Sequence, residues 1–354
     1  MRDNLHEDRA KGIDFLRFFS AMGIVIFHFA CYSEANWNIF LENANASWGN
    51  LLVMTFFMVS GFCLYLNNST IETVAQSIYF YYKRWKSIFP MFYVGYLFCY
   101  IDRMFEVHSL LISPSPWHKI WLTIFGMDGY FLYRSVNFYL IGEWFLGAIV
   151  LVYLIYPLIL WLFEKKPVLL FSVLAALSCF LPYSVFFEIS PSRNLITCTA
   201  CFVTGMLMAR YRQVLQRRIL FWASLFILMA GIFFPVPIIS KTISVALFMA
   251  ISFFIVMKKI GEMLENSGKW CGRVMLFGGK ISYPMFLVQN KVIGFLTTYI
   301  TVSTYIELIK VMGLAVCLSM ICAWCIRTVT QGIIRTKWFS AMDKVILSIC
   351  KEGA

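Results

Sequence analysis

The sequence predicts an all-α fold, a polytopic transmembrane helix bundle of about ten spans. Of the 354 residues, 60% are hydrophobic and 14% are charged, and the mean hydropathy is +0.75. This composition excludes an ordinary soluble globule. Apolar stretches long enough to cross a bilayer recur from end to end, without the short alternating pattern of membrane strands.

The apolar segments follow one another along the chain, and we expect each to form one helical span. Residues 117–129 are apolar but contain Gly126 and follow Pro116, which is typical of a re-entrant or interfacial piece. Residues 1–330 are therefore expected to form a single transmembrane domain, and residues 331–354 a cytoplasmic tail. The predicted spans are residues 13–33, 50–67, 87–101, 138–163, 167–187, 194–209, 219–235, 241–257, 281–300 and 306–326.

The distribution of Lys and Arg predicts the orientation. Alternate loops carry basic clusters, such as residues 83–86, 210–218 and 258–280, whereas the loop 33–49 carries none. Basic residues collect on the cytoplasmic side, so we expect both termini in the cytoplasm. The net charge of +12 then reflects loop topology and lipid headgroups, not a nucleic-acid partner. The eleven cysteines lie mainly in predicted spans or cytoplasmic loops, and we expect no disulfide framework and no metal site.

Three polar residues in the first predicted span stand out against its apolar background. Asp14 and Arg17 are three residues apart and can pair, and His28 follows eleven residues after Arg17. Eleven residues are about three helical turns, so Arg17 and His28 share a face roughly 16 Å apart along the axis. A neutral imidazole can act as a general base. The plainer interpretation is an interfacial arginine and a histidine bonded to a neighbouring helix.

A basic cluster precedes the third span. Lys83, Arg84 and Lys86 lie around its expected cytoplasmic mouth, where they could bind phosphate groups. The positive-inside rule alone would also place them there.

The fourth span opens with Glu143 and Trp144, and Tyr153 follows further in. A carboxylate near the outer boundary favours a functional role, although a solvated loop end would also explain it. The aromatic residues could form an interfacial belt.

The ninth span contains several polar groups. Ser282 and Tyr283 precede Pro284, which is expected to free a backbone carbonyl in the helix. Gln289 and Asn290 place two amides in the span, either for hydrogen bonds between helices or along a substrate path.

Together these motifs resemble the acyltransferase-3 family of integral-membrane O-acyltransferases. The first span is similar to the family's Asp-x-x-Arg followed by ten residues and a His. Ser87 stands where the family often has a second Arg, Ile149 where some members have a Glu, and Gln289 where a late His is common. Gln289 keeps the hydrogen bonding of that His but cannot carry its proton. The other matching stretches are residues 56–62, 82–90, 144–157 and 279–288.

The resemblance implies transfer of an acyl group, most often acetyl, from cytoplasmic acyl-CoA to a sugar hydroxyl. The acceptor would be a cell-envelope polysaccharide, such as lipopolysaccharide or exopolysaccharide, or a polyprenyl-linked glycan. The protein would be a multi-pass protein of the bacterial inner membrane, with acetyl-CoA as co-substrate and no permanently bound cofactor.

The resemblance also implies roles for single residues. The catalytic set would be His28, Arg17 and Asp14, with His28 as the base, Arg17 binding the donor or supporting the site, and Asp14 pairing with Arg17. Two further sets would bind or support the substrates. They are Lys83, Arg84 and Lys86 for acyl-CoA, and Glu143, Trp144, Tyr153, Ser282, Tyr283 and Gln289 for substrate or support. A proton-coupled transporter or a glycan flippase is the alternative, although the sequence shows no internal repeat of the kind that such carriers often have.

Overall fold

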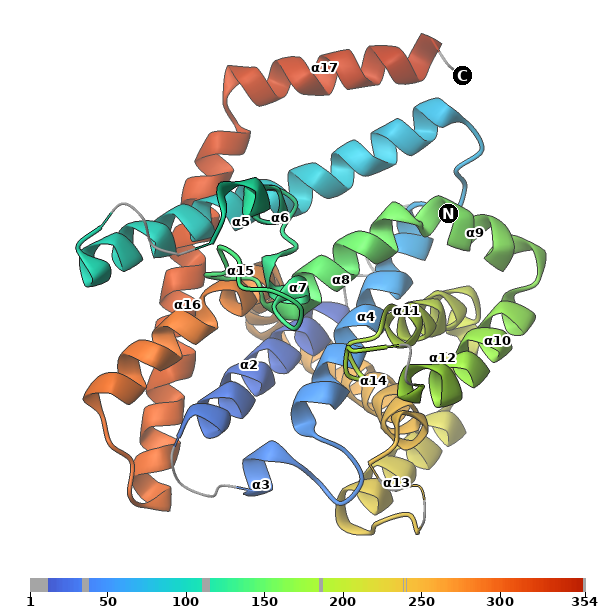
Figure 1. Cartoon of the computed structure of the whole chain (residues 1–354). Helices are drawn as coiled ribbons and strands as arrows, with labels where there is room; N and C mark the ends of the chain where they lie inside the picture. Colours follow the sequence, from blue (N-terminus) through green and yellow to red (C-terminus); the bar gives the residue numbers. More distant parts are fainter. Residues whose placement is uncertain are drawn as a thin grey trace.

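The chain forms a bundle of helices around a common core (Figure 1). The computed structural model describes residues 12–33, 38–109, 115–184, 187–237, 239 and 241–352. Within these residues every regular element is a helix, apart from one isolated bridge between Glu42 and Ser47. The predicted all-α class is therefore confirmed.

The helices differ widely in length. The long ones are α2 (Ile13–Tyr32), α4 (Trp48–Asn67), α5 (Val74–Val107), α14 (Ile243–Asn266), α15 (Lys269–Tyr299) and α16 (Tyr305–Ile334). Those of intermediate length are α8 (Glu143–Leu154), α9 (Tyr156–Lys165), α10 (Pro167–Phe180), α11 (Leu195–Arg210), α13 (Arg218–Phe233) and α17 (Lys337–Glu352). The short ones are α3 (Asn38–Leu41), η1 (Trp117–Lys119), α6 (Ile120–Ile124), α7 (Asp128–Phe131), η2 (Leu181–Tyr183) and α12 (Arg212–Leu215).

Several predicted span boundaries change. Among the described residues, four helices are long and apolar enough to cross a membrane, namely α2, α4, α14 and α16. The predicted span 138–163 is two helices, α8 and α9, which bend by 59° just before Pro157. Proline at the start of α9 cannot donate a hydrogen bond back into α8, which explains a break at this point. The helices α5 and α15 are much longer than the predicted spans 87–101 and 281–300. Ten spans and cytoplasmic termini stay predictions.

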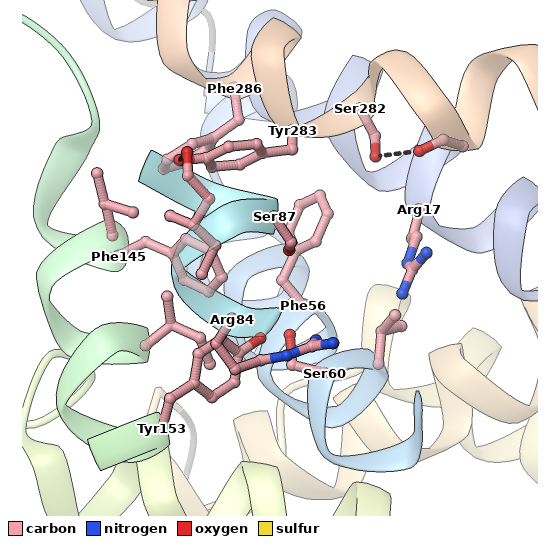
Figure 2. A pocket seen from close by; sticks show the side chains of 15 residues that line it. Arg17, Phe56, Ser60, Arg84, Ser87, Phe145, Tyr153, Ser282, Tyr283 and Phe286 are labelled. Carbon is pink, nitrogen blue, oxygen red and sulfur yellow. Dashed lines mark hydrogen bonds between the residues drawn. The ribbon is translucent and has the colours of Figure 1, made fainter. Parts of the chain in front are cut away.

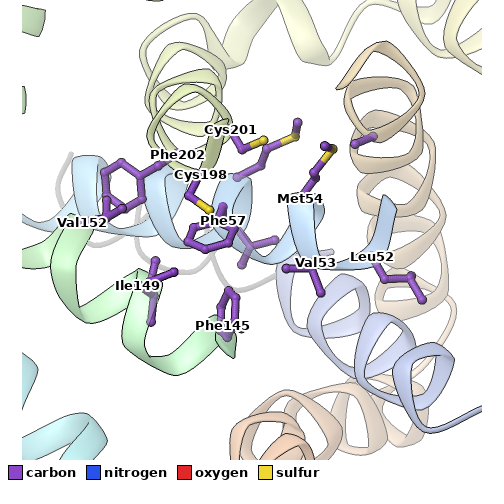
Figure 3. Close-up of a cluster of buried hydrophobic side chains, with 14 of the residues drawn as sticks. Leu52, Val53, Met54, Phe57, Phe145, Ile149, Val152, Cys198, Cys201 and Phe202 are labelled. Carbon is purple, nitrogen blue, oxygen red and sulfur yellow. The ribbon is translucent and has the colours of Figure 1, made fainter. Parts of the chain in front are cut away.

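The tightest packing joins α4 and α11 through two glycines. A Cβ atom on Gly61 would lie 1.9 Å from the backbone oxygen of Phe202, and one on Gly205 would lie 1.9 Å from that of Met58. Each helix therefore lets the backbone of the other approach closely, as small residues do in membrane bundles. Figure 3 shows the buried side chains around this contact, with α4 between α8 and α11.

Replacing Gly205 with alanine is expected to lower the free energy of unfolding by about 1–3 kcal/mol, because the added methyl group overpacks the α4–α11 contact. Thermal unfolding of the purified protein in detergent measures the loss. The matched control is Gly313→Ala in α16, where an added Cβ meets nothing within 4 Å. That change should leave stability unchanged or raise it by about 0.5–1 kcal/mol. Equal effects of the two substitutions would contradict the steric explanation.

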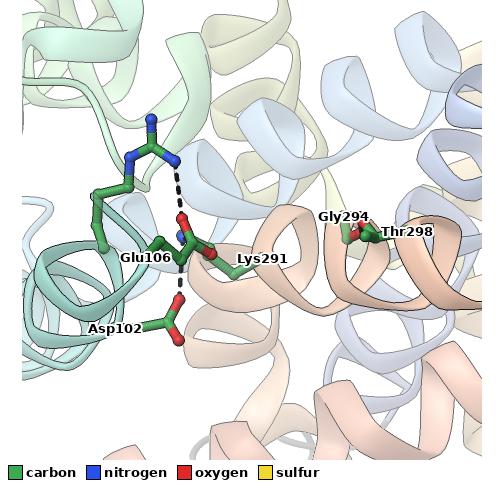
Figure 4. Close-up of polar contacts among 6 residues, drawn as sticks. Asp102, Glu106, Lys291, Gly294 and Thr298 are labelled. Atoms are coloured by element: carbon green, nitrogen blue, oxygen red, sulfur yellow. Dashed lines mark hydrogen bonds and ion pairs between the residues drawn. The ribbon is translucent and has the colours of Figure 1, made fainter. Parts of the chain in front are cut away.

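A hydrogen bond from α16 and ion pairs with α5 hold α15 against its neighbours. Pro284 inside α15 has no N–H to donate to the carbonyl of Lys280, and the Arg327 side chain of α16 donates to that carbonyl instead at 3.2 Å. The carbonyl that we expected Pro284 to free is thus bonded by another helix. Further along α15, Lys291 pairs with Asp102 at 3.0 Å and with Glu106 at 3.5 Å, both on α5 (Figure 4).

The C-terminal helix α17 lies against α5 (Figure 1). Its Asp343 accepts hydrogen bonds from Lys86 and from the Tyr82 hydroxyl, each at 2.7 Å. The Phe339 ring stacks on Trp85, with ring centroids 6.0 Å apart. Within the predicted tail, residues 337–352 therefore form a helix docked on the basic segment of α5.

Acid is expected to release α17 from α5. Hydrogen bonds from Lys86 and then Tyr82 lower the pKa of Asp343 below its usual value. The Lys86–Asp343 ion pair therefore stabilises the docked α17 fully above the usual aspartate pKa of about 3.9. This stabilisation is lost as the pH falls through the lowered pKa of Asp343. The protection factors of the α17 amides, which compare exchange with that of an unstructured chain at the same pH, should fall below about pH 4. Asp343→Asn should show the lower protection factors already at pH 7, and unchanged protection factors in that variant would contradict the assignment.

Candidate active site

A cavity of about 220 Å³, the Arg17 cavity, opens between five helices (Figure 2). Arg17 enters it from α2 and Arg84 from α5. Polar groups from three other helices complete its wall, namely Ser60 on α4, Tyr153 on α8, and Ser282 and Tyr283 on α15. The structure thus brings together residues that the sequence spreads over more than 260 positions.

The two arginines of this cavity differ in their partners. Arg17 lies 3.8 Å from Asp14, which is the pairing expected from their spacing, and it also donates to the Cys63 sulfur at 3.3 Å. Arg84 keeps its buried Nε atom without a hydrogen-bond partner in the described chain. A buried guanidinium N–H is costly unless an anion or another acceptor meets it, so the cavity suits a negatively charged ligand.

The other two predicted phosphate-binding cations lie elsewhere. Lys86 is held by Asp343 of α17, and the Lys83 ammonium lies 5.1 Å from the centre of the Tyr79 ring. Neither lines the Arg17 cavity. Ser87 and Ile149 do line it. Ser87 stands where the resemblance led us to look for a second Arg, and Ile149 where some members of that family have a Glu.

A second cavity of about 160 Å³, the His28 cavity, lies further along α2. Glu143 and Trp144 line it from the start of α8, together with Asn50 of α4 and Arg193 from the loop before α11. Arg17 and His28 therefore line separate cavities, as their spacing along α2 suggests.

Glu143 is held by two neighbours and by its backbone. The Tyr139 hydroxyl donates to its carboxylate at 3.1 Å, and the Asn290 amide of α15 donates to the same oxygen. Its φ of 38° lies in the left-handed region, next to Gly142 at 93°. Strain of this kind in a non-glycine residue persists only where surrounding contacts enforce it, and it occurs often at functional sites. A solvated loop end does not describe this carboxylate.

Several buried polar atoms near His28 make no hydrogen bond. Gln289 lies close enough to His28 to interact with it. Nevertheless, neither the two amide atoms of Gln289 nor His28 Nδ1 makes a hydrogen bond of normal geometry with the described residues. The Oδ1 atom of Asn290 is also unpaired there. Such atoms cost free energy when buried, and neither Gln289 nor Asn290 lines one of the two cavities.

Sequence reasoning missed Arg193. Its guanidinium lies 5.6 Å from the centre of the Trp144 ring, at cation–π distance, in the wall of the His28 cavity. The available signal was a basic residue in a loop that the predicted topology places outside, where such residues are scarce. Arg193 and Glu143 give this cavity both signs of charge.

Metal ions in proteins are held by groups of ligand side chains. The described residues contain no group of three or more His, Cys, Asp or Glu side chains that could hold a metal ion. Cys198 and Cys201 on α11, and Cys322 and Cys325 on α16, have C-x-x-C spacing, but all four are free thiols.

A family model described as an acyltransferase domain matches residues 10–327 of the chain. The chain belongs to the acyltransferase-3 family. The resemblance inferred from the motifs is therefore confirmed, and the match includes both cavities but excludes α17. Membership of this family and the apolar helices identify a multi-pass membrane acyltransferase. The comparison with curated proteins finds no match, and neither does the comparison with solved structures.

Proposed function

We propose that this acyltransferase-3 protein transfers an acetyl group from cytoplasmic acetyl-CoA to a sugar hydroxyl of a bacterial cell-envelope glycan. The observation that carries the proposal is the pair of adjoining cavities, one cationic and one containing a histidine and a carboxylate. A donor with phosphate groups and an acceptor with hydroxyl groups need these two different environments. We place the protein in the inner membrane, with the Arg17 cavity towards the cytoplasm.

The donor is assigned to the Arg17 cavity. Arginine binds phosphate and other anions through its planar set of N–H donors, and Arg84 has an unsatisfied buried Nε for this purpose. Arg17 is partly neutralised by Asp14, so it acts as a second and weaker anion contact. The acetyl-CoA is a co-substrate that leaves as CoA, and no permanently bound cofactor is required.

The acceptor is assigned to the His28 cavity. His28 removes the proton from a sugar hydroxyl while the hydroxyl oxygen forms a bond to the thioester carbonyl carbon. The carbon–sulfur bond then breaks, and the proton passes from His28 to the departing sulfur of CoA. Glu143 and Arg193, which line this cavity, orient the sugar through hydrogen bonds. Gln289 lines neither cavity and is buried, so we assign it support of His28. The acceptor is a polysaccharide, such as lipopolysaccharide or exopolysaccharide, or a polyprenyl-linked sugar.

The test uses the purified full chain in lipid nanodiscs with radiolabelled acetyl-CoA and a panel of envelope glycans and polyprenyl-linked sugars. Alkali-labile label on a glycan is the expected result. Absence of transfer to every acceptor, together with proton-driven solute uptake by the same protein in liposomes, would overturn the proposal in favour of a transporter. Translocation of an unmodified lipid-linked sugar would instead favour a flippase.

A further inference from the structure

The Arg17 cavity and the His28 cavity share two wall residues, Phe145 and Phe286. Phe145 belongs to the first turn of α8 and Phe286 to α15 (Figure 2). Their ring centroids are 5.2 Å apart, and the rings meet edge to face at 73°. Both side chains are buried, with 9% and 6% of their surface exposed. The boundary between the two cavities is therefore aromatic.

Both rings are held firmly. Phe145 also meets Phe56 at 5.9 Å and Phe57 at 4.8 Å, both on α4. It follows the left-handed pair Gly142 and Glu143, which sets the direction in which α8 begins. Phe286 lies two residues after Pro284 and six residues after Lys280, whose carbonyl accepts the hydrogen bond from Arg327 of α16. Edge-to-face pairs of this kind add stability beyond their buried area, so this boundary is a defined structure.

The chemistry of this boundary selects what crosses it. Phosphate groups and sugar hydroxyls would lose their hydration between two phenyl rings without gaining hydrogen bonds, which is costly. An acyl chain is apolar and loses nothing there. An acyl group is also the only part of the donor that has to travel from the Arg17 cavity towards His28.

We propose that Phe145 and Phe286 form an acyl passage that admits a short acyl chain and sets the longest chain that the protein transfers. This proposal rests on the proposed acyl transfer, and it adds the residues that select the acyl group. The CoA phosphates stay in the Arg17 cavity, the sugar stays in the His28 cavity, and the acyl group crosses the boundary along the edge of the two touching rings.

Binding of unreactive donor analogues tests the passage without any transfer step. The probes are S-ethyl-CoA and S-hexyl-CoA, in which a thioether replaces the thioester, and titration calorimetry in nanodiscs gives each Kd. In the wild type, S-hexyl-CoA should bind at least about tenfold more weakly than S-ethyl-CoA. In Phe286→Ala the ratio of the Kd for S-hexyl-CoA to the Kd for S-ethyl-CoA should fall about tenfold. Phe286→Leu, which is gentler on folding, should shift it in the same direction.

The matched control is Phe254→Ala. Phe254 is fully buried and lies 5.6 Å from Phe62, but it lines neither cavity. The ratio of the two Kd values in Phe254→Ala should equal the ratio in the wild type. Equal binding of the two analogues by the wild type, or an unchanged ratio in both Phe286 variants while S-ethyl-CoA still binds, would overturn the passage.

Transfer assays separate this proposal from the one on which it rests. The relative kcat/KM for hexanoyl-CoA over acetyl-CoA should rise at least about tenfold in Phe286→Ala. If the wild type binds the analogues with the expected ratio but transfers no acyl group, the proposed function fails and the passage stands. If the wild type transfers acetyl and the relative kcat/KM is unchanged in Phe286→Ala and Phe286→Leu, the passage fails and the proposed function stands.

Discussion

Replacing His28 with alanine is expected to lower the rate of acetyl transfer by about 10²–10⁴-fold, with the acyl-CoA KM little changed. A sugar hydroxyl is a poor nucleophile until a base removes its proton, and His28 is the imidazole that lines the proposed acceptor cavity. The measurement is initial rate against acetyl-CoA concentration at saturating acceptor. Because His28 lies away from the Arg17 cavity, the loss should fall on kcat.

The matched control is His118→Ala. His118 lies in the short helix η1, is exposed and lines neither cavity. It should keep wild-type activity. A folded His28→Ala protein with full activity would disprove the role of His28 as base and leave Glu143 as the candidate. Glu143→Gln then becomes the deciding variant, since it removes the charge but keeps an oxygen for Tyr139 and Asn290.

Replacing Arg84 with glutamine is expected to raise the KM for acetyl-CoA by about 10–100-fold, with a smaller change in kcat. A hydrogen bond between charged groups contributes about 1.5–3 kcal/mol, and Arg84 is the cavity arginine with an unsatisfied buried N–H. The measurement is the same initial-rate series, with acceptor and donor varied in turn. Binding of CoA itself by calorimetry should weaken in parallel.

Lys86→Gln provides the comparison. The two cations are two residues apart, but Lys86 is held by Asp343 and does not line the cavity. Its removal should change the acetyl-CoA KM less than about threefold, because Lys86 contributes no group to the cavity wall. A larger effect for Lys86 than for Arg84 would reverse the assignment. An effect of Arg84→Gln confined to the glycan KM would contradict a donor site there.

The helical bundle and the placement of Arg17 and His28 along α2 follow from the sequence by simple physical rules. Composition and apolar runs predict membrane helices, and α2 at Ile13–Tyr32 nearly coincides with the predicted first span. Helical geometry correctly separates Arg17 from His28. The Asp14–Arg17 pair also follows, because residues three apart on a helix are neighbours.

Contacts between distant segments do not follow from such rules. The partner of Lys86 lies 257 residues away on α17, and no local pattern indicates it. Arg193 reaches the site because a loop brings it over Trp144, and loop paths depend on the packed helices around them. The bend before Pro157 was also missed, because an unbroken apolar run has the same composition whether it is one helix or two.

The two glycines of the α4–α11 contact have a further consequence. Helix α4 supplies Asn50 to the His28 cavity and Ser60 to the Arg17 cavity, so one rigid rod carries part of both walls. Gly61 and Gly205 bring that helix into close backbone contact with α11, where a Cβ atom on either glycine would collide with the other helix. One helical turn of slippage would move both walls together by about 5.4 Å. Helix α4 itself therefore fixes the distance between Asn50 and Ser60, and the glycine pair fixes where both residues stand relative to α11.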